Sequence, residues 1–143
     1  MSSDRPGAQA NEGRACAVAE RTEVALDPTS IVAEYFARIR ARDIGVVDLF
    51  HDDASLNGLG SRRAGRAAIL EFYRDVFNRV GPVPREAGPI LSAGSRVAAE
   101  IYIDRPGDTT VHAVDLFDVS EGRIRSLTYF IADYSIEEQE PRP

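Results

Sequence analysis

The sequence predicts an α+β domain in which helices pack on one face of a curved antiparallel sheet. Apolar residues recur at helical spacing in the first half of the chain, whereas from about residue 85 onward they recur every second residue. Turn signals at 93–95, 105–108 and 120–122 divide the second half into strands. Helices followed by a meander of strands are typical of α+β domains.

Length and composition restrict the class of protein. A chain of 143 residues fits one domain with a real core. No apolar run is long enough to cross a membrane, and a net charge of -6 with scattered arginines disfavours nucleic acid as a partner. One cysteine and two histidines provide neither a disulfide nor a zinc site, so we expect no metal and no cofactor. Without an apolar signal-peptide core near Met1, a cytoplasmic location is expected.

The ends of the chain differ from its middle. Residues 1–24 mix small and charged residues without a sustained period, which predicts a flexible N-terminal arm, with an added helix around residues 14–20 as the alternative. Residues 25–136 are expected to form the single domain. Residues 137–143 are acidic and end in proline, which predicts a loose tail.

Two amphipathic helices are predicted. The first follows the candidate caps at 27–30 and runs to about residue 42, and the second covers residues 67–80 and ends at Gly81-Pro82. Each has one hydroxyl in its apolar stripe, on Tyr35 and on Tyr73. Such a hydroxyl either finds a partner in a cavity or reaches water.

The remaining elements are shorter. Residues 46–50 form an apolar turn with a polar exit at 51–53, residues 54–57 a short strand, and residues 61–66 a basic loop. The strands of the meander are expected at about 85–91, 96–103, 109–119 and 123–132.

One carboxylate lies in the most apolar of these strands. In residues 111–119, VHAVDLFDV, alternation places Asp115 on the same side as Val111, Ala113, Phe117 and Val119. An unpaired ionised carboxylate there would cost several kcal/mol, so Asp115 is expected to be partnered, protonated or lining a cavity. A solvated sheet face is the alternative.

Alternation alone leaves the register of the neighbouring strands open. Asp115 faces either the apolar set Val97, Ala99, Ile101 and Ile103, or the set Ala98, Glu100 and Tyr102. On the last strand the choice lies between Leu127, Tyr129 and Ile131, or Ser126, Thr128 and Phe130.

Four segments resemble ketosteroid isomerase and, more broadly, the cone-shaped NTF2-like superfamily that also holds the SnoaL-type polyketide cyclases. They are 32–43, 49–54, 65–73 and 114–117, and the likeness covers about residues 31–134. It implies a curved antiparallel sheet packed against N-terminal helices around a deep pocket.

The resemblance also implies roles for single residues. Tyr35 matches the oxyanion-hole tyrosine, Tyr73 the tyrosine that hydrogen-bonds to it, and Asp115 the carboxylic acid that donates the second hydrogen bond, kept neutral by apolar surroundings. It also places Glu100 and Tyr102 on the pocket side. The residues implied as substrate contacts are Asn57, Leu59, Tyr102, Phe117, Leu127, Tyr129 and Ile131.

One departure changes the expected chemistry. The position of the isomerase's general base falls on Gly58 or within one residue of it, so the family's proton shuttle is not expected. The sequence therefore favours a polyketide-tailoring cyclase that binds a flexible, hydrophobic carbonyl compound and promotes cycloaddition or conjugate addition through the oxyanion hole. An aldol-type closure would need Glu100 as base. The alternatives are an isomerase with Glu100 as relocated base, an epoxide-opening enzyme, and a non-catalytic small-molecule binding module.

The opposite face of the sheet predicts a homodimer. With Asp115 turned inward, His112, Val114 and Leu116 lie on the outer face. An exposed apolar sheet face usually marks an interface, so His112 is expected to be an interface residue and not a catalyst.

Overall fold

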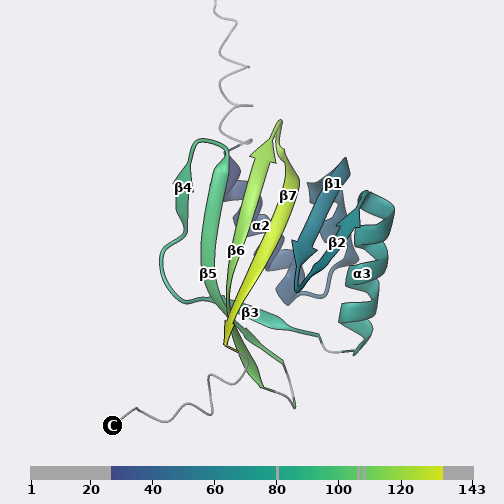
Figure 1. Cartoon of the computed structure of the whole chain (residues 1–143), viewed down its shortest axis with the longest axis vertical. Helices are drawn as coiled ribbons and strands as arrows, with labels where there is room; N and C mark the ends of the chain where they lie inside the picture. Colours follow the sequence, from purple (N-terminus) through teal and green to yellow (C-terminus); the bar gives the residue numbers. More distant parts are fainter. Residues whose placement is uncertain (1–26, 80, 106, 108, 134–143) are drawn as a thin grey trace, which may run out of the picture.

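The computed structural model describes residues 27–79, 81–105, 107 and 109–133 (Figure 1). The predicted N-terminal arm and C-terminal tail lie outside these residues. The elements in chain order are α2 (Pro28–Arg40), the 3-10 helix η1 (Ile44–Leu49), β1 (Phe50–Gly58), β2 (Ser61–Ala64), α3 (Arg66–Arg79), β3 (Val83–Glu86), β4 (Leu91–Ala93), β5 (Arg96–Asp104), β6 (Thr110–Ser120) and β7 (Arg123–Asp133).

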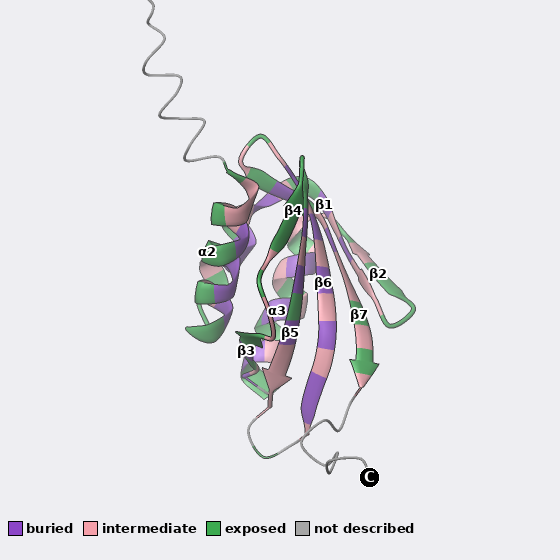
Figure 2. Ribbon diagram, turned by 90° about the vertical axis from the view of Figure 1, so that its left-hand side faces the viewer, coloured by how far each residue is buried: buried purple, intermediate pink, exposed green. Residues whose placement is uncertain are grey.

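The predicted α+β architecture is confirmed. The strands form one curved sheet in the order β2-β1-β7-β6-β5-β3, with β4 also paired to β5, and both long helices cover the same face (Figures 1 and 2). The prediction of a wholly antiparallel sheet is corrected: the sheet is mixed, because β1 pairs in parallel with β7 while every other pair is antiparallel among the described strands. No hairpin joins β1 to β7, so nothing in the connection requires them to be antiparallel.

Two elements differ from the predicted ones. The basic loop at 61–66 is mostly strand β2, which forms a hairpin with β1. Its two-residue turn, Leu59-Gly60, has φ values of 53° and 73°, as a type I′ turn requires. The predicted strand 85–91 is divided into β3 and β4, both paired to β5.

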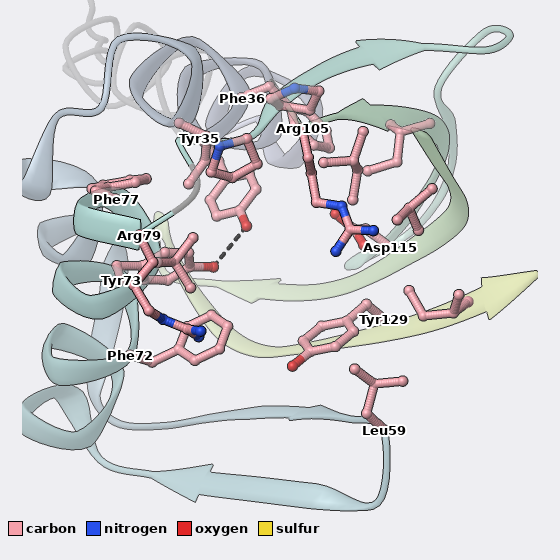
Figure 3. Close-up of a pocket in the computed structure, with 18 residues that line it drawn as sticks. Tyr35, Phe36, Leu59, Phe72, Tyr73, Phe77, Arg79, Arg105, Asp115 and Tyr129 are labelled. Carbon is pink, nitrogen blue, oxygen red and sulfur yellow. Dashed lines mark hydrogen bonds between the residues drawn. The ribbon is translucent and has the colours of Figure 1, made fainter. Parts of the chain in front are cut away.

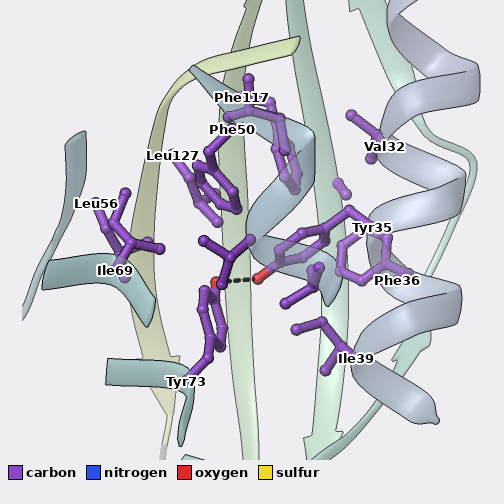
Figure 4. Packing of buried hydrophobic residues seen from close by; sticks show 14 of the residues in the cluster. Val32, Tyr35, Phe36, Ile39, Phe50, Leu56, Ile69, Tyr73, Phe117 and Leu127 are labelled. Atoms are coloured by element: carbon purple, nitrogen blue, oxygen red, sulfur yellow. Dashed lines mark hydrogen bonds between the residues drawn. The ribbon is translucent and has the colours of Figure 1, made fainter. Parts of the chain in front are cut away.

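The helices form where the caps and stripes predict. Asp27 caps α2 by accepting a hydrogen bond from the backbone N–H of Thr29, and Pro28 occupies the first helical position. The core lies between these helices and the sheet (Figure 4). The buried helical side chains are Val32, Tyr35, Phe36 and Ile39 of α2 and Ile69, Tyr73 and Phe77 of α3. No helix in the described ranges is long and apolar enough to span a bilayer.

The register of β5 against β6 corrects the expectation for Glu100 and Tyr102. Ala99 lies opposite Asp115, so β5 presents its apolar set to the helices. Glu100 and Tyr102 lie on the outer face, where the Glu100 carboxylate is 2.7 Å from Nε2 of His112. The resemblance placed them on the wrong face, because Asp104 pairs with Thr110 across the connection and thereby brings odd-numbered residues opposite Asp115.

The register of β6 against β7 agrees with the prediction. Tyr129 lies opposite Asp115, and Leu127 lies opposite Phe117, so the set Leu127, Tyr129 and Ile131 faces inward. Phe130 lies on the outer face opposite Val114 and is 55% exposed. The carboxyl of Asp115 therefore has an apolar strand on one side and a tyrosine on the other.

Candidate functional site

A cavity of about 320 Å³ lies between the two helices and the inner face of the sheet (Figure 3). Its size is near the lower end of the range for small-molecule sites. Its lining is mostly apolar and is shared by both helices, the β1–β2 turn and the central strands. The lining residues are Tyr35, Phe36, Ile39, Leu59, Phe72, Tyr73, Val76, Phe77, Arg79, Pro82, Pro84, Ile101, Ile103, Arg105, Val111, Asp115, Tyr129 and Ile131.

The two helix tyrosines meet inside the cavity. The hydroxyl oxygens of Tyr35 and Tyr73 are 2.7 Å apart, which confirms the predicted hydrogen bond between them (Figures 3 and 4). Edge-to-face packing holds the Tyr35 ring against Phe36 and Phe117. Each ring is therefore fixed by its neighbours, and the pair of hydroxyls joins α2 to α3.

Burial keeps both phenols protonated. It raises the pKa of Tyr35 well above its ordinary value, and the nearby Tyr73 and Asp115 raise it further. Burial also raises the pKa of Tyr73, although the hydrogen bond that it shares with Tyr35 opposes the rise. Either hydroxyl can be the donor of this bond. When Tyr73 donates to the Tyr35 oxygen, the Tyr35 proton is left to point at a ligand.

Asp115 is the buried carboxyl of the cavity. Its residue is 6% exposed, and no hydrogen bond or ion pair joins its carboxyl to any other described residue. Burial raises the pKa of Asp115 to about 7, because the ionised form loses its water. An unpartnered buried polar group facing a cavity is suited to bind a ligand that supplies the missing partner.

The structure brings together only part of the predicted contact set. Leu59, Tyr129 and Ile131 line the cavity as expected. Phe117 and Leu127 lie on the predicted face but are fully buried in the core and do not line it.

Three further predicted residues lie away from the cavity. The side-chain amide of Asn57 on the outer face donates to the hydroxyls of Ser55 and Thr128, which corrects its assignment as a substrate contact. Glu100 and Tyr102 share that outer face and are corrected with it, so Glu100 is not positioned to act as a base in the cavity. Strand alternation explains all three placements, since each lies next to an inward-facing residue.

The ring of Tyr129 packs directly against Gly58. A Cβ atom at Gly58 would lie 2.3 Å from the Tyr129 ring, well inside van der Waals contact. The tyrosine therefore fills the volume into which a side chain at position 58 would extend. A catalytic side chain at position 58 is therefore incompatible with this placement of the Tyr129 ring.

Sequence reasoning missed several lining residues. The helix stripe of α3 contained Val76 and Phe77, but the stripe alone does not distinguish core positions from cavity positions. Arg79 and Arg105 also line the cavity, one at the end of α3 and one directly after β5. No sequence signal placed these two arginines together, because 26 positions separate them along the chain.

Comparisons with known proteins agree with this geometry. The sequence profile of the SnoaL-like domain family matches residues 32–127. No curated protein sequence matches the chain.

Solved structures share the fold at low sequence identity. A candidate ketosteroid isomerase from Kribbella flavida DSM 17836 is 20% identical with a TM-score of 0.68, over 81% of this chain and 82% of that one. A candidate polyketide cyclase from Sinorhizobium meliloti is 23% identical with a TM-score of 0.64, over 70% and 93% of the two chains. An NTF2-like protein of unknown function from Cytophaga hutchinsonii is 16% identical with a TM-score of 0.65, over 73% and 89%. The expected NTF2-like fold is therefore confirmed.

The raised pKa of Asp115 predicts a pH-dependent stability. Between about pH 4 and pH 7 the unfolded carboxyl is ionised while the folded one is protonated, so unfolding releases a proton and stability falls as pH rises. The shift to about 7 corresponds to a loss on the order of 4 kcal/mol. Asp115→Asn has no such proton, so its unfolding free energy relative to the wild type should increase from pH 4 to pH 7 and then level off. Urea titrations across this range measure it, and a constant difference would contradict a raised pKa.

The contact between Gly58 and Tyr129 predicts the effect of a single methyl group. Gly58→Ala should displace the tyrosine ring and lower the unfolding free energy by about 1–3 kcal/mol, the usual cost of overpacking. Gly88→Ala is the matched control, because a Cβ there meets nothing nearer than 4.0 Å. In the background of Tyr129→Ala, the cost of the added methyl should largely disappear. An equal cost in both backgrounds would show that the two residues do not share this space.

Proposed function

The chain belongs to the SnoaL-like domain family, and we propose that it is a cyclase that closes a ring in a hydrophobic, carbonyl-containing small molecule of polyketide type. The observation that carries the proposal is the buried, unpartnered Asp115 carboxyl in the same apolar cavity as the Tyr35–Tyr73 pair. A neutral carboxyl and a phenol are both hydrogen-bond donors. Together they form an oxyanion hole for one carbonyl oxygen.

The proposed step needs no second catalytic group in the cavity. In a conjugate addition, a nucleophilic atom of the substrate bonds to the carbon β to the carbonyl, and the electron pair moves through the enone onto the carbonyl oxygen. Tyr35 and protonated Asp115 stabilise the charge that develops there. The nucleophilic atom loses its proton as the new bond forms, and the α carbon takes up one proton as the oxygen regains its carbonyl form, so the product is an isomer of the substrate. The apolar walls hold the chain folded, which removes part of the entropy cost of ring closure.

The position of Glu100 on the outer face limits the reactions that the cavity can support. Aldol-type closure and isomerisation with Glu100 as the base both require that carboxylate in the cavity, whereas it lies beside His112 on the other side of the sheet. Among the described lining residues, Asp115 is the only carboxyl. Its pKa near 7 supports a second candidate function, an isomerase in which ionised Asp115 is the base and Tyr35 the donor.

Substitutions at Asp115 and Tyr35 distinguish the two candidates once a substrate is in hand, for instance from mass spectrometry of a co-purified ligand. As a neutral donor, Asp115 should tolerate Asn, which keeps an N–H donor, while Asp115→Leu should cost on the order of 10- to 1000-fold in turnover. Tyr35→Phe should cost a similar factor and leave the protein folded. Activity should fall as pH rises through about 7.

A base at Asp115 predicts the reverse pattern. Asn would then be as damaging as Leu, and activity would fall as pH drops through about 7, because acid protonates the base. Equal losses for the two substitutions would end the donor assignment.

A non-catalytic binding module is tested by titration with phenols of similar size and different acidity. A preorganised donor pair should make affinity depend on phenol pKa, and Tyr35→Phe should remove that dependence. A purely apolar pocket should follow ligand size alone. Ile131→Val is the control, because it alters the wall of the cavity and leaves the donors in place.

We also propose that the chain forms a homodimer through the outer face of β5, β6 and β7. Val114, Leu116 and the 55% exposed Phe130 form an apolar area there. His112 and Glu100 lie beside it as a polar pair. An isologous interface would cover this area in both copies.

Light scattering tests the dimer. At tens of micromolar the mass should be twice the chain's 15.6 kDa, and Phe130→Glu should reduce it to that of one chain, because a buried carboxylate in the interface would lack a partner. Ile44→Glu is the control: Ile44 is a 40% exposed apolar residue in η1, which contacts the two helices. A single-chain mass for the wild type would rule the dimer out.

A further inference from the structure

We infer that the ligand of the cavity is an amphipathic carboxylate: its carbonyl end lies deep, at Tyr35 and Asp115, and its carboxylate lies at the mouth, against Arg79 and Arg105. This inference rests on the proposed function, because it assumes that the donor pair binds the other end of the same molecule. It narrows the substrate class from a hydrophobic carbonyl compound to one that is also a free acid.

Burial divides the lining into a floor and a mouth. Tyr35, Tyr73 and Asp115 are each at most 6% exposed and lie at the closed end. Leu59 is 66% exposed, and the side chain of Arg79 is 68% exposed. Arg105 is half-buried and lies six residues along the chain from Ala99, which is the β5 partner of Asp115. The buried hydroxyl and carboxyl groups therefore lie deeper in the cavity than the two guanidinium groups.

The two arginines come from different walls. Arg79 ends α3, and Arg105 follows β5, so a ligand entering the cavity passes between a helix end and a strand end (Figure 3). Arg105 is held in place by hydrogen bonds from Nε to the Thr109 carbonyl, 3.2 Å, and from Nη2 to the Thr109 hydroxyl, 2.6 Å. Arg79 Nε is 3.0 Å from the Asp75 carboxylate, a pair in which both side chains are well exposed and which therefore costs little to exchange for a ligand.

The charges of the lining favour an anion at the mouth. Among the described lining residues, the cations are Arg79 and Arg105, and the only carboxyl is Asp115 at the floor. The chain as a whole carries -6, so two guanidinium groups in the lining of one cavity contrast with the overall charge. A guanidinium presents a planar set of donors that matches a carboxylate.

Two fluorescent probes of equal shape test the inference. 6-Hydroxy-2-naphthoate carries a phenol for the donor pair and a carboxylate for the mouth, and 6-hydroxy-2-naphthamide replaces the carboxylate by a neutral amide. We expect the naphthoate to bind on the order of tenfold more tightly than the amide at low salt. The advantage should shrink as ionic strength rises, because mouth charges near solvent are screened.

Variants test whether the two arginines cause the tighter binding of the naphthoate. Arg79→Gln and Arg105→Gln should each remove a large part of this advantage, because they should weaken binding of the naphthoate more than binding of the neutral amide. Arg74→Gln is the matched control, since it removes the same charge from an exposed position of α3 that does not line the cavity. Arg105→Lys keeps the charge without the fork that contacts Thr109, and it should keep more of the advantage than Gln.

The outcomes separate this inference from the proposed function. If Tyr35→Phe weakens binding of the amide and the naphthoate binds no more tightly than the amide, the carboxylate assignment is wrong and the proposed oxyanion hole stands. If amide binding ignores Tyr35→Phe, the proposed function fails, whatever the arginines do. Equal loss of the advantage in Arg74→Gln and Arg79→Gln, or no binding of either probe, overturns the inference.

Discussion

A carboxyl group buried in the apolar face of a sheet is the constraint on which the site depends. Asp115 lies in β6 between an alanine on one neighbouring strand and a tyrosine on the other, with no partner among the described residues. Such a group is stable when it is protonated or when a ligand completes its hydrogen bonds. The raised pKa of Asp115 is the direct consequence of this burial.

The two long helices supply the other buried polar groups of the cavity. Tyr35 lies in α2 and Tyr73 lies in α3, and their hydroxyl oxygens are 2.7 Å apart in the space above the sheet. In the proposed oxyanion hole this bond satisfies one hydroxyl and leaves the other to act as the donor. Aromatic neighbours pack against both rings, Phe36 and Phe117 against Tyr35, and Phe72 and Phe77 against Tyr73, so the proposed donor is positioned before a ligand binds.

The rest of the cavity separates two kinds of chemistry. Its floor has neutral donors in an apolar setting, where a developing negative charge is stabilised most. Its mouth has guanidinium groups near solvent, where a permanent negative charge is accommodated at low desolvation cost. On the side of the sheet that faces away from the cavity, the Glu100 carboxylate and His112 are paired with one another. This division follows from the two-residue alternation of β5 and β6.

The sequence by itself determined what depends on local periodicity. The stripes of the two helices and the alternating faces of β6 can be derived from spacing. Spacing left the face of Leu127, Tyr129 and Ile131 open, and only the resemblance placed these residues on the side of the pocket. Only the tertiary structure decided how those segments meet. The register of β5 against β6 depends on the geometry of the connection between them, and a shift of one residue exchanges the two faces. For this reason Glu100 and Tyr102 were predicted on the wrong face, although the apolar alternation of β5 was also compatible with the correct one. The packing of Tyr129 against Gly58 and the presence of Arg79 and Arg105 in the lining of one cavity bring together residues far apart in the chain. Such arrangements arise from tertiary packing, which no local pattern encodes.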